Sequence, residues 1–294
     1  MRILVTGGSG MVGKSLKKIL PNADYFSSKD LNLLDEDSVK SHMELKKYDT
    51  VIHLAAKVGG IIDNINKPEE YFIENIQMNT NILKWSRLTN VKRFIGILST
   101  CIYPDKVNKY PMEENIIHKG PPAPTNFSYG YAKRCLAVHI DACNKQYNTQ
   151  YQYLIPCNLY SEYDNFSNNN KMHFITALLN KIKKSKGTIN LVGTGKPLRQ
   201  FMYAGDFAKI IKEVINNNIL ESFNVSPNYN YSIDEMVKIA LKCVGKRYNV
   251  SYSNPELDGQ YRKDVSSKIF KKYFSNFKFT NFEDGIIKVY DKIS

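Results

Sequence analysis

The sequence lacks the features that mark membrane-spanning and disulfide-stabilised proteins. No stretch approaches the roughly eighteen consecutive apolar residues of a transmembrane helix. The five cysteines are odd in number and none forms a Cys-x-x-Cys pair, which argues against a disulfide framework and a metal site. We see no signal-peptide pattern before the strand-like run at residues 2–6. We therefore expect a cytoplasmic protein with no membrane partner and no bound metal ion.

Acidic residues are the minority among the charged side chains, and the formal net charge is +13. A strongly basic chain can bind nucleic acid, but such proteins gather lysine and arginine along one face or helix. Here the basic residues are spread along the chain, with short clusters only at 181–186 and 271–272. We therefore expect no nucleic-acid partner and favour anionic small ligands.

No internal repeat or long linker interrupts the 294 residues. The order of apolar strands and amphipathic helices is typical of an α/β fold, with a Rossmann-type doubly wound parallel sheet and a smaller mixed α/β substrate-binding domain. We assign residues 1–160 to the domain that holds this sheet, to which the chain returns at about 200–222. Residues 161–199 and 223–294 are assigned to the smaller domain.

A glycine-rich turn follows the first predicted strand. Gly7, Gly10 and Gly13 form Gly-x-x-Gly-x-x-Gly, and an amphipathic helix at 14–20 comes next. This spacing allows a tight turn and a close approach of the backbone to a pyrophosphate, which the helix N-terminus then faces. A strand before and a helix after distinguish a dinucleotide site from an ordinary glycine turn. The predicted cofactor contacts here are Gly7, Gly10, Met11, Val12 and Gly13.

The second predicted strand, at 24–26, is followed by two serines and a lysine. A NAD site often has an acidic residue at this point to hold the adenosine ribose. A hydroxyl and a cation suit the 2′-phosphate of NADPH better, so we favour NADPH, with Ser28 and Lys29 as contacts. Asp35 is a candidate for the adenine edge, and the alternative is that Asp35 caps the helix that follows.

Two further apolar strands end in residues suited to a ligand, because ligands gather at the carboxyl ends of parallel strands. Small residues follow the strand at 49–54 and let a cofactor lie close to the backbone; the contacts expected there are Leu54, Ala55 and Ala56. Ser99 ends the strand at 92–98, where a hydroxyl can hold a carbonyl substrate and a tyrosine phenol together. His53 is interpreted as a packed core histidine.

Tyr129 and Lys133 are four residues apart and would share one face of a helix that starts near Ser128, a candidate N-cap. An ammonium held near a phenol favours the phenolate, so a tyrosine that normally titrates near about 10 becomes a usable acid or base at neutral pH. The pair is a weak signal by itself. The glycine turn and Ser99 give it catalytic meaning.

Together, the glycine turn, Ser99, Tyr129 and Lys133 resemble the extended short-chain dehydrogenase/reductase family. Within it the chain looks like the NADPH-dependent branch that epimerises and reduces GDP-4-keto-6-deoxy sugars. The similarity runs from residue 1 to about residue 265. The runs that carry it are 53–60, 99–104, 156–160, 164–166 and 193–201.

The resemblance implies catalytic roles. Tyr129 would give a proton to the C4 oxygen as hydride arrives from the nicotinamide, while Lys133 lowers its pKa and holds the cofactor ribose. Ser99 would hydrogen-bond the keto oxygen. Cys101 and His173 match the pair that moves protons at C3 and C5, and carbons beside a ketone are acidic enough for such steps.

The resemblance also implies binding residues and a partner. Arg199 would contact the nucleotide diphosphate, and Lys263 the smaller domain's side of the same site. Asn158 and Asn165 are expected at the substrate, and Pro156 with Asn158 at the cofactor. The family usually dimerises through the helix that carries the tyrosine, so we expect a homodimer.

Some positions depart from the branch's pattern. Ser161 and Glu162 replace Gly-Pro, one extra residue precedes His173, Val192 replaces Trp, and the run after Lys263 is shorter. These changes cluster around the sugar and base pockets and leave hydride transfer intact.

The function predicted is therefore NADPH-dependent epimerisation at C3 and C5 and reduction at C4 of GDP-4-keto-6-deoxy-D-mannose. A C4-reductase without epimerisation, acting on a related GDP-4-keto sugar such as a GDP-4-keto-6-deoxy-heptose, stays open. A 4,6-dehydratase is disfavoured because Cys101 and Ile102 stand where that branch has Asp-Glu. A non-catalytic cofactor-binding protein would tolerate loss of the tyrosine or the lysine, and both are present.

Overall fold

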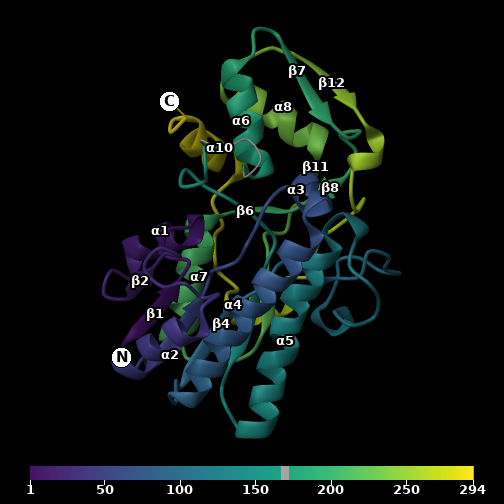
Figure 1. Cartoon of the computed structure of the whole chain (residues 1–294). Coiled ribbons are helices and arrows are strands. Elements are labelled where there is room, and N and C mark those ends of the chain that lie inside the picture. The colour runs from purple at the N-terminus through teal and green to yellow at the C-terminus, as the bar shows by residue number, and fades with distance from the viewer. Residues whose placement is uncertain (167–171, 294) are drawn as a thin grey trace.

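The computed structural model describes residues 1–166 and 172–293, and it has two lobes (Figure 1). The larger lobe holds a six-stranded sheet in the order β10-β5-β4-β3-β1-β2, and every neighbouring pair in it is parallel. This is the α/β fold with a Rossmann-type parallel sheet that the sequence predicted.

The strands of this sheet are short and mostly buried, as expected for parallel strands covered by helices on both faces. They are β1 (Ile3–Thr6), β2 (Asp24–Phe26), β3 (Thr50–His53), β4 (Arg93–Ile97), β5 (Gln152–Pro156) and β10 (Phe223–Val225).

Helices cover both faces of the sheet. On one face α1 (Met11–Ile19) packs beside α7 (Ala204–Asn216), and their apolar sides share a core that includes Val5, Leu16 and Phe207. The other face carries three helices, whose core includes Leu83, Phe94 and Leu136; they are α2 (Glu36–Lys46), α4 (Pro68–Leu88) and α5 (Phe127–Tyr147).

The smaller lobe is built on its own core of Leu179, Leu191, Val237 and Ile286. Strands β7 (Thr188–Val192) and β12 (Asn249–Ser253) pair in parallel there. Its helices are α6 (Phe174–Lys184), α8 (Ile233–Cys243) and α10 (Phe282–Tyr290). Two small pairs of strands lie near the junction of the lobes: β6 (Asn158–Tyr160) with β9 (Phe201–Tyr203), and β8 (Leu198–Arg199) with β11 (Tyr231–Ser232). Two short helices complete the chain, α3 (Ile61–Asn66) and α9 (Lys268–Tyr273).

The predicted domain boundary had the chain leave the larger lobe after residue 222. In the structure the chain stays on that lobe. Residues 223–225 form β10, which pairs with β5 at the edge of the large sheet. Phe270 and Phe274 then return to pack against Phe223 with tilted rings. Burial of these aromatic rings holds the segment on the larger lobe, and a boundary read from chain order could not show that return.

Helix α5 starts at Phe127, so Ser128 is not its N-cap. The N-cap is Asn126, and its side chain makes no capping hydrogen bond. A 3-10 turn, η3 (Pro124–Asn126), leads directly into the helix. Because the chain is already turning there, Ser128 falls inside the first helical turn.

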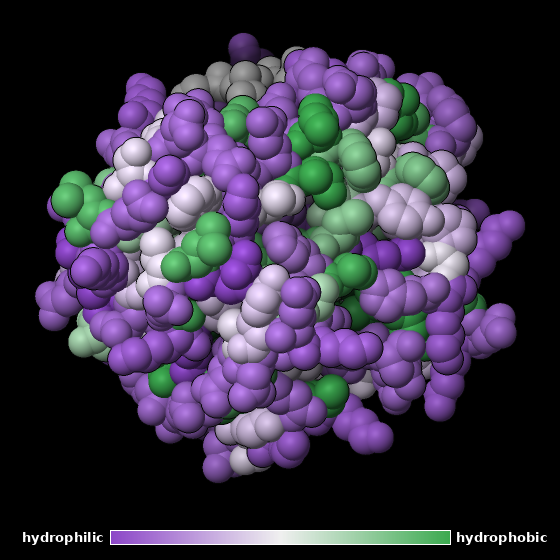
Figure 2. Space-filling model, turned by 60° about the horizontal axis from the view of Figure 1, so that its bottom comes forward, coloured by the Kyte–Doolittle hydropathy of each residue, from purple (hydrophilic) through white to green (hydrophobic). Residues whose placement is uncertain are grey.

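The face of the molecule in Figure 2 is mostly hydrophilic, with apolar side chains in small groups among polar ones. In the part of the chain that the structure describes, no helix is long and apolar enough to span a bilayer. The same described part contains no group of three or more His, Cys, Asp or Glu side chains placed to hold a metal ion.

Candidate active site

A cavity of about 1190 Å³ lies between the two lobes. The larger lobe lines it with the glycine turn, the carboxyl ends of β3, β4 and β5, and the start of α5. The smaller lobe lines it with Phe174, Leu191, Arg199 and neighbouring residues. The cavity therefore brings together groups as far apart in sequence as Thr6 and Lys263.

The glycine turn lines this cavity with a backbone that has no room for side chains. Gly7 has φ +71, and a Cβ there would lie 2.7 Å from the nitrogen of Ala55. A Cβ on Gly13 would lie 2.6 Å from the carbonyl oxygens of Gly7 and Gly8. Helix α1 begins at Met11, with Gly10 as an N-cap that makes no side-chain hydrogen bond. Its first N–H groups are thus left for an anionic ligand, so the turn fits a pyrophosphate.

The nucleotide end of the cavity differs in part from the sequence prediction. Ser28 lines it, together with residues 31–34, whereas Lys29 is exposed and does not belong to the lining. The carboxylate of Asp35 accepts hydrogen bonds from the backbone N–H groups of Asp37 (3.1 Å) and Ser38 (3.4 Å). Asp35 is therefore the N-cap of α2, which was the alternative interpretation, and it is not a lining residue.

The other predicted cofactor contacts line the cavity: Met11, Val12, Leu54, Ala55, Ala56, Pro156 and Asn158. His53 is fully buried, with its ring between the hydroxyl of Thr6 (2.8 Å) and the side-chain oxygen of Asn79 (2.9 Å), so it is a packed core residue as predicted.

Ser99, Tyr129 and Lys133 meet at the carboxyl end of β4. Lys133 is only 2% exposed, and its ammonium donates to the carbonyl of Ile97 at 2.9 Å. Burial lowers the pKa of Lys133 to about 8. Burial and the nearby negative charge of Cys101 raise the pKa of Tyr129 above its ordinary value, and a hydrogen bond with Ser99 opposes that rise.

The raised pKa of Tyr129 is the opposite of the lowered pKa that the Tyr-x-x-x-Lys spacing predicted. Helical spacing places Lys133 on the same face as Tyr129, but its ammonium bonds to a backbone carbonyl instead of the phenol. A protonated phenol with a raised pKa suits a group that donates a proton, not one that removes it.

Cys101 lies in a 3-10 turn, η1 (Thr100–Ile102), directly after Ser99. Its sulfur accepts from the amide of Asn126 at 2.6 Å and from the ammonium of Lys263 at 3.0 Å. Burial raises the pKa of Cys101, but the charge of Lys263, the hydrogen bonds with Ser99 and Lys263 and the charge of Arg199 outweigh it, so the pKa lies below its ordinary value.

His173 lines the cavity just before α6, and it is paired with a carboxylate. Its Nδ1 lies 2.9 Å from Oδ1 of Asp164, whose side chain is 5% exposed against 37% for His173. The pKa of Asp164 lies below its ordinary value. Burial raises it, but the hydrogen bond and charge interaction with His173 lower it by more. With the carboxylate as the acceptor at Nδ1, the other ring nitrogen, Nε2, is left for a ligand.

Three of the predicted substrate contacts, Arg199, Lys263 and Asn165, differ in where the structure places them. Arg199 lines the cavity, and its guanidinium is anchored by the carbonyls of Leu198 (2.9 Å) and Asp258 (3.3 Å). Lys263 also lines the cavity, but its ammonium donates a hydrogen bond to the sulfur of Cys101. Asn165 is outside the lining, and its backbone N–H donates to Asp164 at 2.9 Å.

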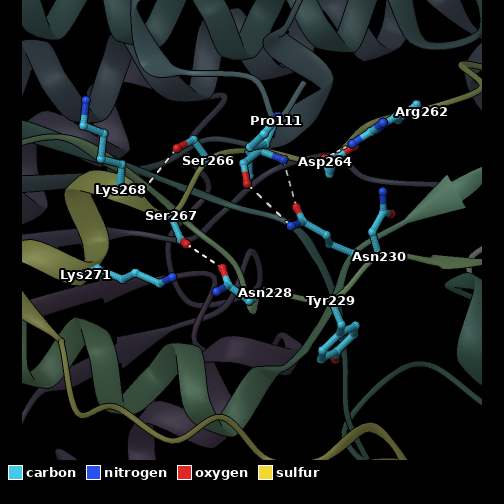
Figure 3. Close-up of a pocket in the computed structure, with 12 residues that line it drawn as sticks. Pro111, Asn228, Tyr229, Asn230, Arg262, Asp264, Ser266, Ser267, Lys268 and Lys271 are labelled. Atoms are coloured by element: carbon cyan, nitrogen blue, oxygen red, sulfur yellow. Dashed lines mark hydrogen bonds and ion pairs between the residues drawn. The ribbon is translucent and has the colours of Figure 1, made fainter. Parts of the chain in front are cut away.

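A second hollow of about 530 Å³ opens beside α9 (Figure 3). Its polar groups largely satisfy one another. Arg262 bonds to Asp264 at 2.6 Å, and the hydroxyl of Ser267 donates to Asn228 at 2.9 Å. None of the predicted site residues lines it, so the cavity between the lobes is the candidate active site.

Residues 3–226 match the family described as "NAD dependent epimerase/dehydratase family". The chain belongs to this family. Among its relatives, a GDP-L-fucose synthase of Dictyostelium discoideum is 36% identical over 97% of this chain and 92% of that protein. A GDP-L-colitose synthase of Yersinia pseudotuberculosis is 33% identical over 98% of this chain and 96% of that protein.

Solved structures agree with this family assignment. A GDP-L-fucose synthetase from Naegleria fowleri, bound to NADP, superimposes with a TM-score of 0.88 at 32% identity and covers 99% of this chain and 92% of that one. A GDP-mannoheptose C4 reductase from Campylobacter jejuni has a TM-score of 0.85 at 21% identity, covering 99% of this chain and 97% of that one, so it shows a shared fold alone.

In this family member, sequence reasoning missed two residues that contact the predicted proton-moving pair. Asp164 pairs with His173 across nine positions, and Asn126 bonds to Cys101 across twenty-five. Neither spacing has the period of a helix or a strand, so only folding brings the partners together. Asp164 did stand in one of the runs that carry the family resemblance, which was the one available signal.

Proposed function

We propose that this chain is a GDP-L-fucose synthase, an NADPH-dependent enzyme that converts GDP-4-keto-6-deoxy-D-mannose to GDP-L-fucose. The observation that carries the proposal is that Ser99, Tyr129, Cys101 and His173 all line the one cavity that also holds the glycine turn. A reductase needs only the first two of these beside its cofactor. The other two add a pair of groups able to move protons.

The reduction uses the groups at the end of β4 and the start of α5. Bound NADPH supplies the hydride. Ser99 holds the C4 oxygen of the sugar, and the phenol of Tyr129 gives that oxygen a proton as the carbonyl is reduced. The raised pKa of Tyr129 keeps this proton on the phenol until the oxygen becomes basic. Lys133, buried beside them, would hold the cofactor ribose.

Epimerisation uses Cys101 and His173. Removal of a proton from the carbon beside the ketone moves the electron pair onto the C4 oxygen, where Ser99 and Tyr129 stabilise it. Return of a proton on the opposite face inverts the carbon. Cys101 comes from the larger lobe and His173 from the edge of the smaller one, so a sugar between them is reached from two sides.

The substrate's nucleotide diphosphate would extend toward the smaller lobe, where backbone carbonyls anchor the guanidinium of Arg199 and its remaining N–H groups can meet an anion. Ser28 lines the opposite end, where its hydroxyl would hold the adenosine 2′-phosphate that distinguishes NADPH from NADH. All five cysteines are free, in keeping with a reducing, cytoplasmic setting.

The deciding experiment incubates the protein with NADPH and GDP-4-keto-6-deoxy-D-mannose and determines the product by NMR. We expect inversion at C3 and C5 with reduction at C4. A product reduced at C4 but unchanged at C3 and C5 would support the alternative, a C4-reductase of a related GDP-4-keto sugar such as a GDP-4-keto-6-deoxy-heptose. The same assay in deuterated water reports proton exchange at C3 and C5 separately from reduction.

A further inference from the structure

The sulfur of Cys101 is contacted by two nitrogen donors from distant parts of the chain. Lys263 reaches it from 162 residues away at 3.0 Å, and Asn126 from 25 residues away at 2.6 Å. A neutral thiol is a weak hydrogen-bond acceptor, whereas a thiolate is a strong one. Two donors converging on one sulfur therefore favour the thiolate.

Lys263 has no carboxylate partner to account for its burial. Its residue is 8% exposed, and among the described residues no carboxylate lies within ion-pair distance of its ammonium. The adjacent Asp264 is already paired with Arg262 at 2.6 Å. The carboxylate of Asp258 accepts hydrogen bonds from the backbone N–H and the hydroxyl of Thr194, both at 2.6 Å. Since a buried charge needs a counter-charge, the sulfur of Cys101 is the group left to provide it.

The amide of Asn126 is oriented by the same sulfur. Its Nδ2 donates to Cys101, while its Oδ1 is buried without a hydrogen-bond partner among the described residues. The η3 turn and the start of α5 fix the backbone at this position. Among the described residues, the side chain of Asn126 thus gives its only hydrogen bond to the thiol sulfur.

The remaining groups that face Cys101 act in the same direction. Arg199 adds a second positive charge and Ser99 a hydrogen bond, and both lower the pKa of the thiol against the effect of burial. The charge of Cys101 in turn raises the pKa of Tyr129. No acidic side chain is among the groups that shift the pKa of Cys101.

We propose that Lys263 and Asn126 are positioning residues that hold Cys101 as a thiolate and so make it the group that removes the proton during epimerisation. In that step an S–H bond forms as the C–H bond beside the ketone breaks, and the carbon's electron pair moves to the C4 oxygen. His173, set by Asp164, then returns a proton from the other face. This inference rests on the proposed function, because epimerisation is a step of that function.

The test measures alkylation of Cys101 by iodoacetamide across pH in the full chain, without cofactor or sugar, with the Cys101 peptide quantified by mass spectrometry. We expect Cys101 to react at a pH below that of an ordinary thiol. Lys263→Met should move the midpoint upward by about one pH unit or more, which is about a tenfold loss of thiolate near neutral pH. Lys263→Arg should restore it, and Asn126→Ala should give a smaller upward shift.

The matched control is Lys181→Met, which removes a positive charge from the same cavity at a residue that bonds to Asn190 instead of Cys101. Its alkylation profile should stay that of the parent chain. An unchanged profile in folded Lys263→Met, with a raised KM for the sugar nucleotide, would overturn the proposal and make Lys263 a diphosphate ligand. If Lys263→Met does not fold, Lys263→Gln is read in the same way. Because no sugar is present, this result stands apart from the test of the proposed function.

Discussion

At the scale of single residues, the candidate site shifts the pKa values of two neighbouring groups in opposite directions. Tyr129 and Cys101 both line the cavity, and the charge of Cys101 raises the pKa of Tyr129. Positive charge from Lys263 and Arg199 favours the thiolate of Cys101, and that negative charge opposes ionisation of Tyr129. One pocket can thus hold a base and an acid at the same pH.

Replacement of the phenol tests its role as proton donor. Tyr129→Phe should lower the rate of NADPH oxidation by about 10²- to 10⁴-fold, because a positioned acid contributes about that much. Cofactor affinity, measured by fluorescence titration, should change little. The control is Tyr131→Phe on the same helix, whose ring packs against Phe127, and its turnover should be retained. Substantial turnover by Tyr129→Phe would remove the phenol from the reaction.

The carboxylate behind His173 gives a second prediction. Asp164→Asn keeps the shape of the side chain but removes the charge that orients the ring at 2.9 Å. Deuterium exchange at C3 and C5 should slow by about ten- to a hundredfold, within the range that proton transfer contributes. Reduction of a ketone already in the product configuration should be nearly unaffected. NMR in deuterated water measures both rates, and equal slowing of the two would contradict the assignment.

Lys133 makes a prediction about stability and pH. Its pKa is about 8 in the folded chain, below the ordinary 10.5, so between these values the unfolded chain binds more protons at this residue. Stability must then rise with pH across this window, by at most about 1.4 kcal/mol per pH unit for one group. Urea unfolding of the cofactor-free chain at several pH values should show this rise. The rise should shrink in Lys133→Met and persist in Lys181→Met.

At the scale of elements, the sequence predicted regular segments well and their partners poorly. The strands predicted at 2–6, 24–26, 49–54 and 92–98 correspond to β1, β2, β3 and β4, because runs of apolar residues reflect burial directly. Asp35 was ambiguous for a physical reason. A carboxylate before a helix suits both an adenine edge and a helix N-terminus, and the backbone N–H groups of α2 lie close enough to donate to it.

The contacts around Cys101 could not be predicted from the sequence. Lys263 was expected at the substrate because its position matched the resemblance, but its ammonium lies on a sulfur 162 residues away. Nothing in local spacing encodes that approach. The segment between Phe166 and His173, where an extra residue was expected, lies mostly outside the described residues.

The glycine turn gives an element-scale prediction. Gly13→Ala would place a methyl group 2.6 Å from two carbonyl oxygens, so the turn or α1 must shift. We expect a loss of about 1–3 kcal/mol of stability, typical of overpacking, with weaker NADPH binding. Thermal unfolding and cofactor titration measure the two effects. Gly60→Ala, where a Cβ meets nothing within 4 Å, is the stability control.

At the scale of the whole molecule, the active site is complete only when the two lobes are together. The larger lobe brings the glycine turn, Ser99 and Tyr129, and the smaller one brings Arg199 and the start of α6. Helices α4 and α5 lie on the outside of this assembly and expose apolar side chains that neither lobe covers (Figure 1). We propose that a second copy of the chain covers them, as the expected homodimer requires.

The exposed face of α5 supplies the last prediction. Phe127 and Val138 are 47% and 52% exposed and lie eleven residues apart, which places them on one side of the helix. Val138→Asp should weaken self-association by about tenfold or more, since the dimer would bury two unpaired carboxylates. Light scattering across a concentration series measures it. Leu45→Asp on α2, where Leu45 is 77% exposed, should leave self-association unchanged, and a parent chain that stays monomeric at every concentration would exclude the dimer.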